Sequence, residues 1–301
     1  MILGEQDSYM SVEDYISEAM KEDVQYARYV ELCVNLANKE MSSLNDFFRE
    51  KNMPTYDAEV RIKNSDVVNS EVSPYAFYIN SGVFYTCFKT GFHFYSELFS
   101  DSFLNKALKS SALLLPFQFI LYHELSHIYR AHDDSYDGSI NKDSFIKATE
   151  MDADLMSVAK LYRVLQSSFQ SKCIADREMR FLVLLCAIVV LCVMSQHSND
   201  NVYQGECERL WDIVLKISHL KEDRNSEAPV DVDLTSDTTK GNFDAQIDFL
   251  LRLENLPILE SEMVTFINSF IEHISTFKES RTITAWEKIK DKVAKASKTI
   301  A

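Results

Sequence analysis

Residues that interrupt helices are scarce in this chain. It contains 6 glycines and 5 prolines in 301 residues, against usual shares of roughly 7% for glycine and 5% for proline. Neither residue type occurs between Gly138 and Gly205. Long stretches without turn formers indicate helices. Apolar residues make up 46% of the chain, so a sizeable core can form, and the sequence predicts a mostly helical protein.

A different pattern occupies residues 57–95. Residues 58–64 (AEVRIKN) alternate, and residues 74–95 are rich in aromatic and β-branched side chains, so we expect two or three antiparallel strands with tight turns. Residues 221–242 are polar and acidic and predict a surface loop. Helices are expected over residues 11–50, 112–131, 144–170, 177–195 and 205–220, and in three C-terminal segments divided near Pro257 and Ser280. The predicted fold class is mainly α with a small antiparallel β-sheet (α+β).

The net charge and the cysteines restrict the partners and the cellular compartment that this chain can have. A formal net charge of −15 argues against a nucleic-acid partner and against docking on anionic membranes. The six cysteines form no C-x-x-C pair, which argues against a disulfide framework. The first residues carry neither a basic segment nor a long apolar one, so no secretory signal is recognised. Together these features predict a cytoplasmic protein.

The most apolar run is the 14-residue segment FLVLLCAIVVLCVM at 181–194. A helix that spans a bilayer needs about 17–25 apolar residues, so this run predicts a buried core helix and membrane association is not expected. Insertion into a membrane, with flanking residues extending the run, is the alternative.

The segment FILYHELSHIYRAH, residues 119–132, carries an H-E-x-x-H pattern at His123, Glu124 and His127. Four residues advance a helix by about 400°, so the two imidazoles lie roughly 40° apart and can reach one ion. Glu124 would lie beside the ion, where it can take a proton from a metal-bound water. Because the helix is apolar almost all round, its polar side chains need partners. A metal would satisfy them, and a core of hydrogen-bonded histidines is the alternative.

A catalytic zinc site uses three protein ligands. Metzincins place a glycine and a third ligand where this chain has Arg130 and Asp133, which excludes that family. His132 lies about 140° from the face of His127, so it could bind only if the helix ended first.

The next predicted helix offers a better third ligand. Glu150 and Asp154 are four residues apart among apolar neighbours, so they share one face of the helix. Glu150 could complete a His-His-Glu site, and Asp154 could accept the N–H of a ligating histidine in the second shell. An exposed acidic face that also includes Asp152 is the alternative.

The sequence HELSHIYRAH followed by EMDAD resembles the gluzincin metallopeptidases over about residues 75–165. It is similar to their compact bacterial branch, which includes HtpX-like, ImmA/IrrE-type and Lit-type phage-exclusion peptidases. Length, acidity and the absence of a signal fit the Lit-type group best. The resemblance implies zinc ligands His123, His127 and Glu150 and the base Glu124. It also implies that the aromatic hairpin at 76–88 supplies an edge strand for substrate backbone.

Some of these families carry a downstream His-Pro…Arg element. This chain has His197 and Arg209 in a similar place, with Ser198 where the proline would be. The resemblance suggests His197 as a stabiliser of the transition state, and a loop histidine is the alternative.

The predicted function is zinc-dependent endopeptidase activity on a specific intracellular protein, with Glu124 as the base. We expect one metallopeptidase domain over residues 1–301, with a catalytic core at about 57–200 and the helices of 1–56 and 201–301 as elaborations. A protein or peptide activator is conceivable, because a peptidase inside a cell must be restrained. The alternatives are a catalytically silent regulatory or binding protein with a peptidase fold, as in phage defence or stress response, and a structural zinc site.

Overall fold

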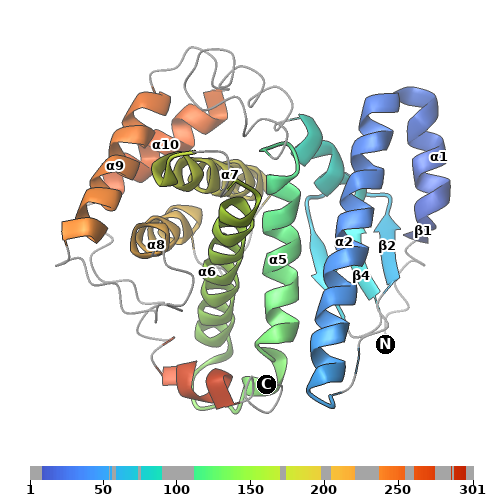
Figure 1. Cartoon of the computed structure of the whole chain (residues 1–301), viewed down its shortest axis with the longest axis horizontal. Coiled ribbons are helices and arrows are strands. Elements are labelled where there is room, and N and C mark those ends of the chain that lie inside the picture. Colours follow the sequence, from blue (N-terminus) through green and yellow to red (C-terminus); the bar gives the residue numbers. More distant parts are fainter. Residues whose placement is uncertain are drawn as a thin grey trace.

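The structure is a computed structural model. It describes residues 9–53, 55, 59–73, 76–89, 112–169, 174–197, 205–220, 237–254, 261–274, 286 and 288–295. Two layers are evident, with a sheet and two helices beside a larger bundle of helices (Figure 1). The predicted fold class, mainly α with a small β-sheet, is confirmed.

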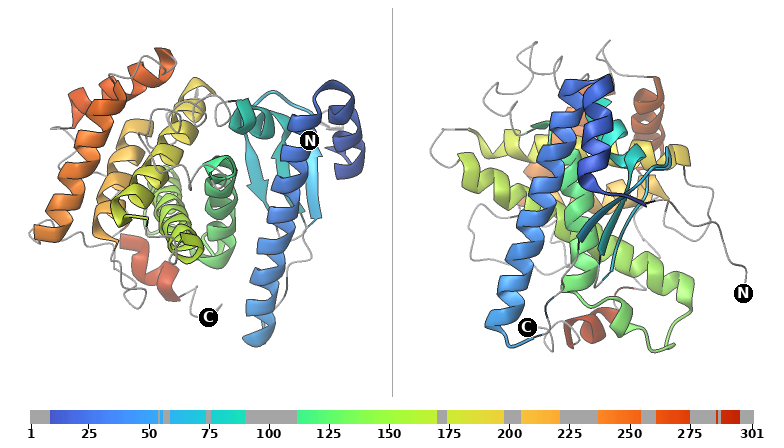
Figure 2. Two further views of the ribbon diagram at one scale, coloured as in Figure 1. Left: turned by 45° about the horizontal axis from the view of Figure 1, so that its top comes forward. Right: turned by 90° about the vertical axis from the view of Figure 1, so that its right-hand side faces the viewer.

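The N-terminal helices α1 (Val12–Glu22) and α2 (Val24–Glu50) pack against each other and against the sheet, and α2 also contacts the helix bundle (Figure 2). Each begins at a side-chain cap that satisfies free backbone N–H groups. Ser11 accepts from the backbone N–H of Asp14, and Asp23 accepts from those of Gln25 and Tyr26. The cap at Asp23 therefore marks the break between the two helices. Their bounds confirm the helices expected over residues 11–50.

The sheet is mixed, which corrects the antiparallel arrangement expected from the sequence. Its strands are β1 (Tyr9–Met10), β2 (Glu59–Lys63), β3 (Ser70–Val72) and β4 (Ala76–Asn80), in the order β1-β2-β4-β3. The central pair β2 and β4 is parallel, and the outer pairs are antiparallel. After β2 the chain forms β3 and then reverses direction into β4. Strand β4 therefore runs antiparallel to β3 and parallel to β2.

The expected aromatic hairpin at 76–88 is also corrected. Only residues 76–80 are extended, because a helix begins at Ser81 and covers residues 81–89. Val83, Phe84 and Cys87 are buried at helical spacing, which the β-branched and aromatic composition concealed. A Cβ at position 82 would lie 2.4 Å from the carbonyl oxygen of Asp66, so glycine is needed for this close approach. The remaining expected strand residues, 90–95, lie outside the described part of the chain.

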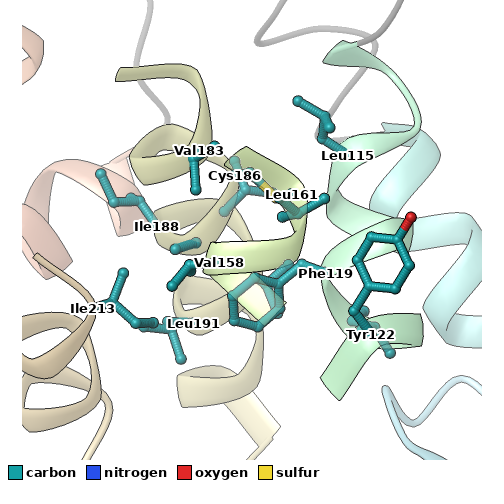
Figure 3. Packing of buried hydrophobic residues seen from close by; sticks show 14 of the residues in the cluster. Leu115, Phe119, Tyr122, Val158, Leu161, Val183, Cys186, Ile188, Leu191 and Ile213 are labelled. Atoms are coloured by element: carbon teal, nitrogen blue, oxygen red, sulfur yellow. The ribbon is translucent and has the colours of Figure 1, made fainter. Parts of the chain in front are cut away.

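Four helices form the core: α5 (Leu115–Tyr129), α6 (Lys142–Phe169), α7 (Asp176–His197) and α8 (Glu206–His219). Apolar side chains from all four meet in Figure 3, among them Phe119, Val158, Leu191 and Ile213. Residues 181–192 of α7 are buried, which confirms the expected core helix. Among the described helices, none combines the length and the apolar character that crossing a bilayer requires.

Helices α9 (Asp237–Glu254) and α10 (Ser261–His273) cover the far side of this core (Figure 1). Residues 286 and 288–295 are helical as well. Residues 237–242 were expected in a loop but open α9, and residues 221–236 of that expected loop lie outside the described chain. His197 is likewise the last residue of α7 and not a loop residue.

Candidate metal centre

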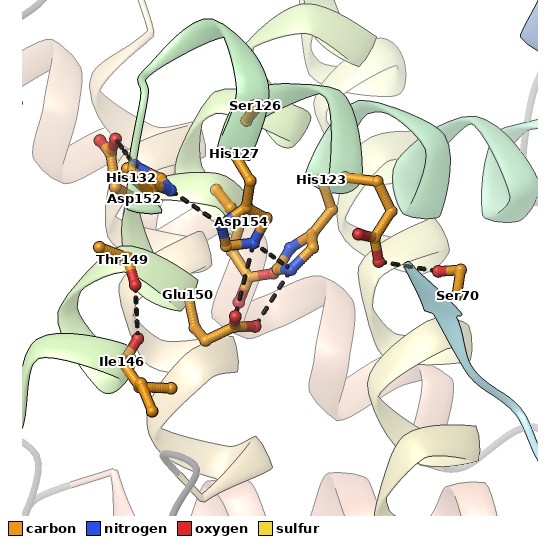
Figure 4. A network of polar contacts seen from close by, with 12 residues as sticks. Ser70, His123, Ser126, His127, His132, Ile146, Thr149, Glu150, Asp152 and Asp154 are labelled. Atoms are coloured by element: carbon orange, nitrogen blue, oxygen red, sulfur yellow. Dashed lines mark hydrogen bonds and ion pairs between the residues drawn. The ribbon is translucent and has the colours of Figure 1, made fainter. Parts of the chain in front are cut away.

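The pairing of α5 with α6 brings three side chains together. His123 and His127 lie one turn apart on α5, and Glu150 lies on the facing side of α6 (Figure 4). One donor atom from each lies within 4.8 Å of the other two, so the group could hold a metal ion. The structure thus places all three residues singled out from the sequence at one point.

The distances between the donor atoms of these side chains are nearly equal. His123 Nε2 lies 3.1 Å from Glu150 Oε2 and 3.3 Å from His127 Nε2, and His127 Nε2 lies 3.4 Å from Glu150 Oε1. Donor atoms at about 2.0–2.1 Å from one tetrahedral ion are themselves separated by roughly 3.3 Å. The two imidazoles therefore already lie at this spacing from each other, and each lies at it from a different oxygen of Glu150.

A buried ion pair holds His123 from behind. Asp154 Oδ1 lies 2.9 Å from His123 Nδ1. Arg209, on α8, donates to the same carboxylate from Nε at 2.7 Å and from Nη2 at 2.8 Å. The side chains of Asp154 and Arg209 are 2% and 4% exposed, so water does not compete for these contacts. We call Asp154 and Arg209 the direct support.

A longer network stands behind His127. His132 Nδ1 lies 2.9 Å from His127 Nδ1, and His132 Nε2 lies 3.0 Å from Asp152 Oδ2. Arg130 Nε donates to that carboxylate oxygen at 2.8 Å. We call His132, Asp152 and Arg130 the relayed support; Figure 4 labels His132 and Asp152. It was not anticipated from the sequence.

The sequence-based alternative of an exposed acidic face does not fit Asp152, which is 4% exposed. Its partners come from the end of α5, where the helix stops at Tyr129 and Ala131 takes a φ of 51°. This left-handed residue reverses the chain and returns His132 toward His127. A possible signal was the Arg130 and His132 pair close behind the motif, since two basic side chains near a buried helix end need acidic partners.

Glu124 points to a different neighbour. Its Oε1 accepts a hydrogen bond of 2.8 Å from Ser70 Oγ on β3. Ser70 begins the edge strand of the described sheet, and β3 packs against α5. Burial raises the pKa of Glu124 to about 7, while the charge of His123 and the bond from Ser70 oppose the rise. Glu124 can therefore gain and lose a proton near neutral pH.

The two histidines of the group have opposite electrostatic surroundings. Burial would lower the pKa of His123, but the carboxylates of Glu150 and Asp154 raise it to about 10. Burial and the charge of His123 lower the pKa of His127 to about 3. Burial would raise the pKa of Glu150, but His123 lowers it to about 2. Without a metal, His123 and Glu150 therefore form an ion pair beside a neutral His127.

Exposure falls from the group toward the two residues that contact its histidines from behind. The side chains of His127 and Glu150 are 22% and 18% exposed, whereas His132 and Asp154 are 1% and 2% exposed. His127 and Glu150 are therefore partly open to solvent, while His132 and Asp154 stay dry. The side chain of His197 lies outside the described residues, so its suggested role stays a prediction. Arg209, noted beside it in the sequence, belongs to the direct support.

The site itself indicates a class of protein. A pair of helices that presents a His-His-Glu group, with a further carboxyl beside it, fits a metallopeptidase. Residues 105–228 match the family Peptidase U49. The match covers less than half of the chain and takes in helices α5 to α8, which carry both supports. It supports peptidase activity. No curated protein and no solved structure matches the chain.

Proposed function

We propose that the protein is a zinc-dependent endopeptidase of the gluzincin type. The observation that carries this proposal is the meeting of His123, His127 and Glu150: the two Nε2 atoms lie 3.3 Å apart, and each lies 3.1–3.4 Å from one oxygen of the Glu150 carboxylate. In this proposal the three residues are the metal ligands, Glu124 is the base, and Asp154 orients His123. The match to Peptidase U49 supports the reaction class.

The donor set suits zinc. Two imidazoles with one carboxylate form a common ligand set in catalytic zinc sites, which leave a coordination position open. The partial exposure of His127 and Glu150 is compatible with an open position, since water and substrate can approach from that side. A closed structural site would call for a fourth ligand, often cysteine. The only group of this kind among the described residues contains no cysteine.

A zinc ion bound there would supply Lewis-acid polarisation of the scissile carbonyl and of the attacking water. The protein supplies the proton transfers. Glu124 removes a proton from the water as it attacks, and then delivers that proton to the leaving nitrogen. Its pKa of about 7 suits both steps. A nearby cation would lower that pKa and favour the carboxylate, which is the form that accepts the proton.

Strand β3 provides a place for the substrate backbone. It is the edge strand next to α5, and it reaches the base through Ser70. An extended peptide that adds to such an edge gains main-chain hydrogen bonds. In this proposal the edge strand is β3 and not the 76–88 segment, because β4 is enclosed between β2 and β3.

We further propose that the substrate is one specific intracellular protein, and that the enzyme in the cytoplasm is inactive until a protein or peptide activator binds it. The likeness of HELSHIYRAH and EMDAD to Lit-type phage-exclusion peptidases supports this finer assignment. Rapid digestion of unrelated unfolded proteins by the purified chain would count against selectivity.

The variant Glu124→Gln tests the reaction. It removes the base but none of the three proposed ligands, so it should bind zinc like the wild type and show no hydrolysis. Because the wild type could be inactive without its activator, cleavage is best sought by comparing the proteomes of cells that express wild type or Glu124→Gln. Zinc binding without any wild-type-specific cleavage would favour the alternative, a catalytically silent regulatory protein. Equal cleavage by both would refute the assignment of Glu124.

A further inference from the structure

We propose that His132 is a positioning residue that fixes the ring and tautomer of His127 for metal binding, and that Asp152 and Arg130 hold His132 in that role. The inference rests on the proposed metal centre and extends it by three residues. It assigns a task to a buried histidine that lies outside the H-E-x-x-H pattern.

The donors and acceptors of this hydrogen-bond network can be assigned starting from Arg130. Asp152 is an acceptor, since Arg130 donates to its Oδ2 and to its Oδ1. The third contact of this carboxylate, from His132 Nε2 at 3.0 Å, therefore carries the proton on His132. In this proposal His132 is the tautomer with its proton on Nε2, so Nδ1 presents a lone pair to His127. His127 Nδ1 is then the donor in the 2.9 Å contact between the two Nδ1 atoms.

This assignment leaves the opposite nitrogen of His127 free to bind a cation. With its proton on Nδ1, His127 has a lone pair on Nε2, and that atom faces His123 Nε2 and Glu150 Oε1 at 3.3 and 3.4 Å. Without a metal this lone pair faces the protonated ring of His123, and a bound cation would take the place of that proton. The network behind His127 thus prepares the tautomer that a metal ligand needs.

The backbone places His132 at a cost, which argues against a chance contact. Ala131 adopts the left-handed conformation, which is unfavourable for a residue with a Cβ. The reversal is held by two backbone bonds, from Ala131 to Ile128 and from His132 to His127, and by the Ser135 hydroxyl on the Ala131 carbonyl. The resulting turn buries His132 almost completely.

The far end of the network contacts the C-terminal part of the chain. The guanidinium of Arg130 lies 5.9 Å from the centre of the Trp286 ring, within cation–π range. In the same helical segment, Lys292 Nζ lies 2.6 Å from Asp137 Oδ2 and 2.5 Å from Ser139 Oγ, in the segment that follows α5. Trp286 and Lys292 therefore contact the two sides of the turn that carries Arg130 and His132.

The experiment measures the zinc dissociation constant of the full-length chain by competition with a chelator. In His132→Phe the volume is retained, but His127 Nδ1 loses its acceptor, so the Kd should rise by about 10–100-fold. In His132→Asn the amide oxygen can still accept from His127, so most of the affinity should return. The absorption spectrum of the cobalt-substituted protein should change in the Phe variant and resemble that of the wild type in the Asn variant.

Gln246→Leu is the matched control. Gln246 is fully buried on α9, which contributes no residue to the metal centre or its supports, and it donates at 2.6 Å to Ser218 near the end of α8. This variant should lower the free energy of unfolding and leave the zinc Kd unchanged. If zinc affinity fell equally in all three variants, or stayed within about twofold of wild type in His132→Phe, the positioning role would be refuted.

Asp152→Asn gives a second test if the Phe variant does not fold. The amide keeps the size of the side chain but weakens the acceptor for His132, so a smaller loss of zinc affinity is expected and an unchanged Kd would overturn the inference. A wild-type chain that takes up no zinc would refute the metal centre itself. A wild type that binds zinc beside an unaffected His132→Phe would refute only the role of His132.

Discussion

The two histidines of α5 are supported by two aspartates of α6, but along different routes. Asp154 touches His123 directly and is paired with the buried Arg209. Asp152 reaches His127 only through His132 and is paired with Arg130, which is 22% exposed. Residues two apart on a helix do not share a face, so the two carboxylates diverge. The second histidine therefore needs an intermediary, which the turn after α5 supplies.

The direct support should be the more critical for folding. Asp154→Ala leaves the buried Arg209 without its carboxylate, and breaking a buried ion pair in this way typically costs about 3–5 kcal/mol. Asp152→Ala should cost less, because Arg130 is partly exposed to water. Urea unfolding of the metal-free variants measures both. A larger loss in Asp152→Ala would invert the comparison.

A double variant can separate stability from positioning in the direct support. Asp154→Leu combined with Arg209→Met replaces the buried pair by apolar groups of similar size, which often restores stability. Zinc affinity should stay about 10–100-fold weaker, because His123 Nδ1 has no acceptor. Arg180→Met is a matched control, since Arg180 is 3% exposed and paired with Asp176 elsewhere in the core. It should lose stability without losing zinc affinity.

The two histidines should also differ in their titration without metal. His123, with a pKa of about 10, should stay protonated from pH 5 to 8, and His127, with a pKa of about 3, should stay neutral over that range. Ring resonances in NMR spectra of the metal-free protein, assigned with His→Gln variants, report both. Two histidines that titrate together near pH 6.5 would contradict the contrast.

The pH dependence of the free energy of unfolding should follow from the directions of these pKa shifts. The raised pKa of His123 contributes stability that is complete below about 6.5 and is lost as the pH rises toward 10. The lowered pKa of His127 destabilises the fold progressively as the pH falls from about 6.5 to 3. The lowered pKa of Glu150 contributes stability that is lost as the pH falls from about 4.5 to 2. The midpoint of unfolding should therefore fall on acidification below pH 6.5. His127→Gln should reduce that fall.

The smallest effect is expected at Ser70, which belongs to neither support. Ser70→Ala removes one hydrogen bond from Glu124, which is worth about 1–3 kcal/mol when the acceptor is charged. Zinc affinity should not change, while hydrolysis should fall by roughly 5–100-fold through kcat. Ser70→Thr retains the hydroxyl and should preserve more of the rate. A loss of zinc binding in Ser70→Ala would mean that β3 also supports the ligands.

Helical periodicity explains how much could be predicted from the sequence. The spacing of His123 with His127, and of Glu150 with Asp154, depends only on local helix geometry, and the structure brings the four together. The helices of the core and the burial of 181–192 were confirmed for the same reason. Arg209 and Asp152 gained their partners through packing between elements distant in sequence, which a local pattern does not encode.

The errors have a different origin. Residues 81–89 contain side chains typical of strands, but tertiary packing and the close approach at Gly82 favour a helix. The position of His132 depends on one left-handed alanine, which has no sequence signature. A parallel pairing of β2 with β4 likewise follows from the path of the connecting segment and not from strand composition.

The most direct test of the central claim is X-ray absorption at the zinc edge on the zinc-loaded chain, with wild type beside His123→Ala. The account predicts one zinc per chain, coordinated in the wild type by two imidazole nitrogens and carboxylate or water oxygens at about 2.0–2.2 Å. His123→Ala should lose one imidazole and most of its zinc affinity. A wild type that binds no zinc, a site with sulfur ligands, or identical spectra for the two proteins would contradict it.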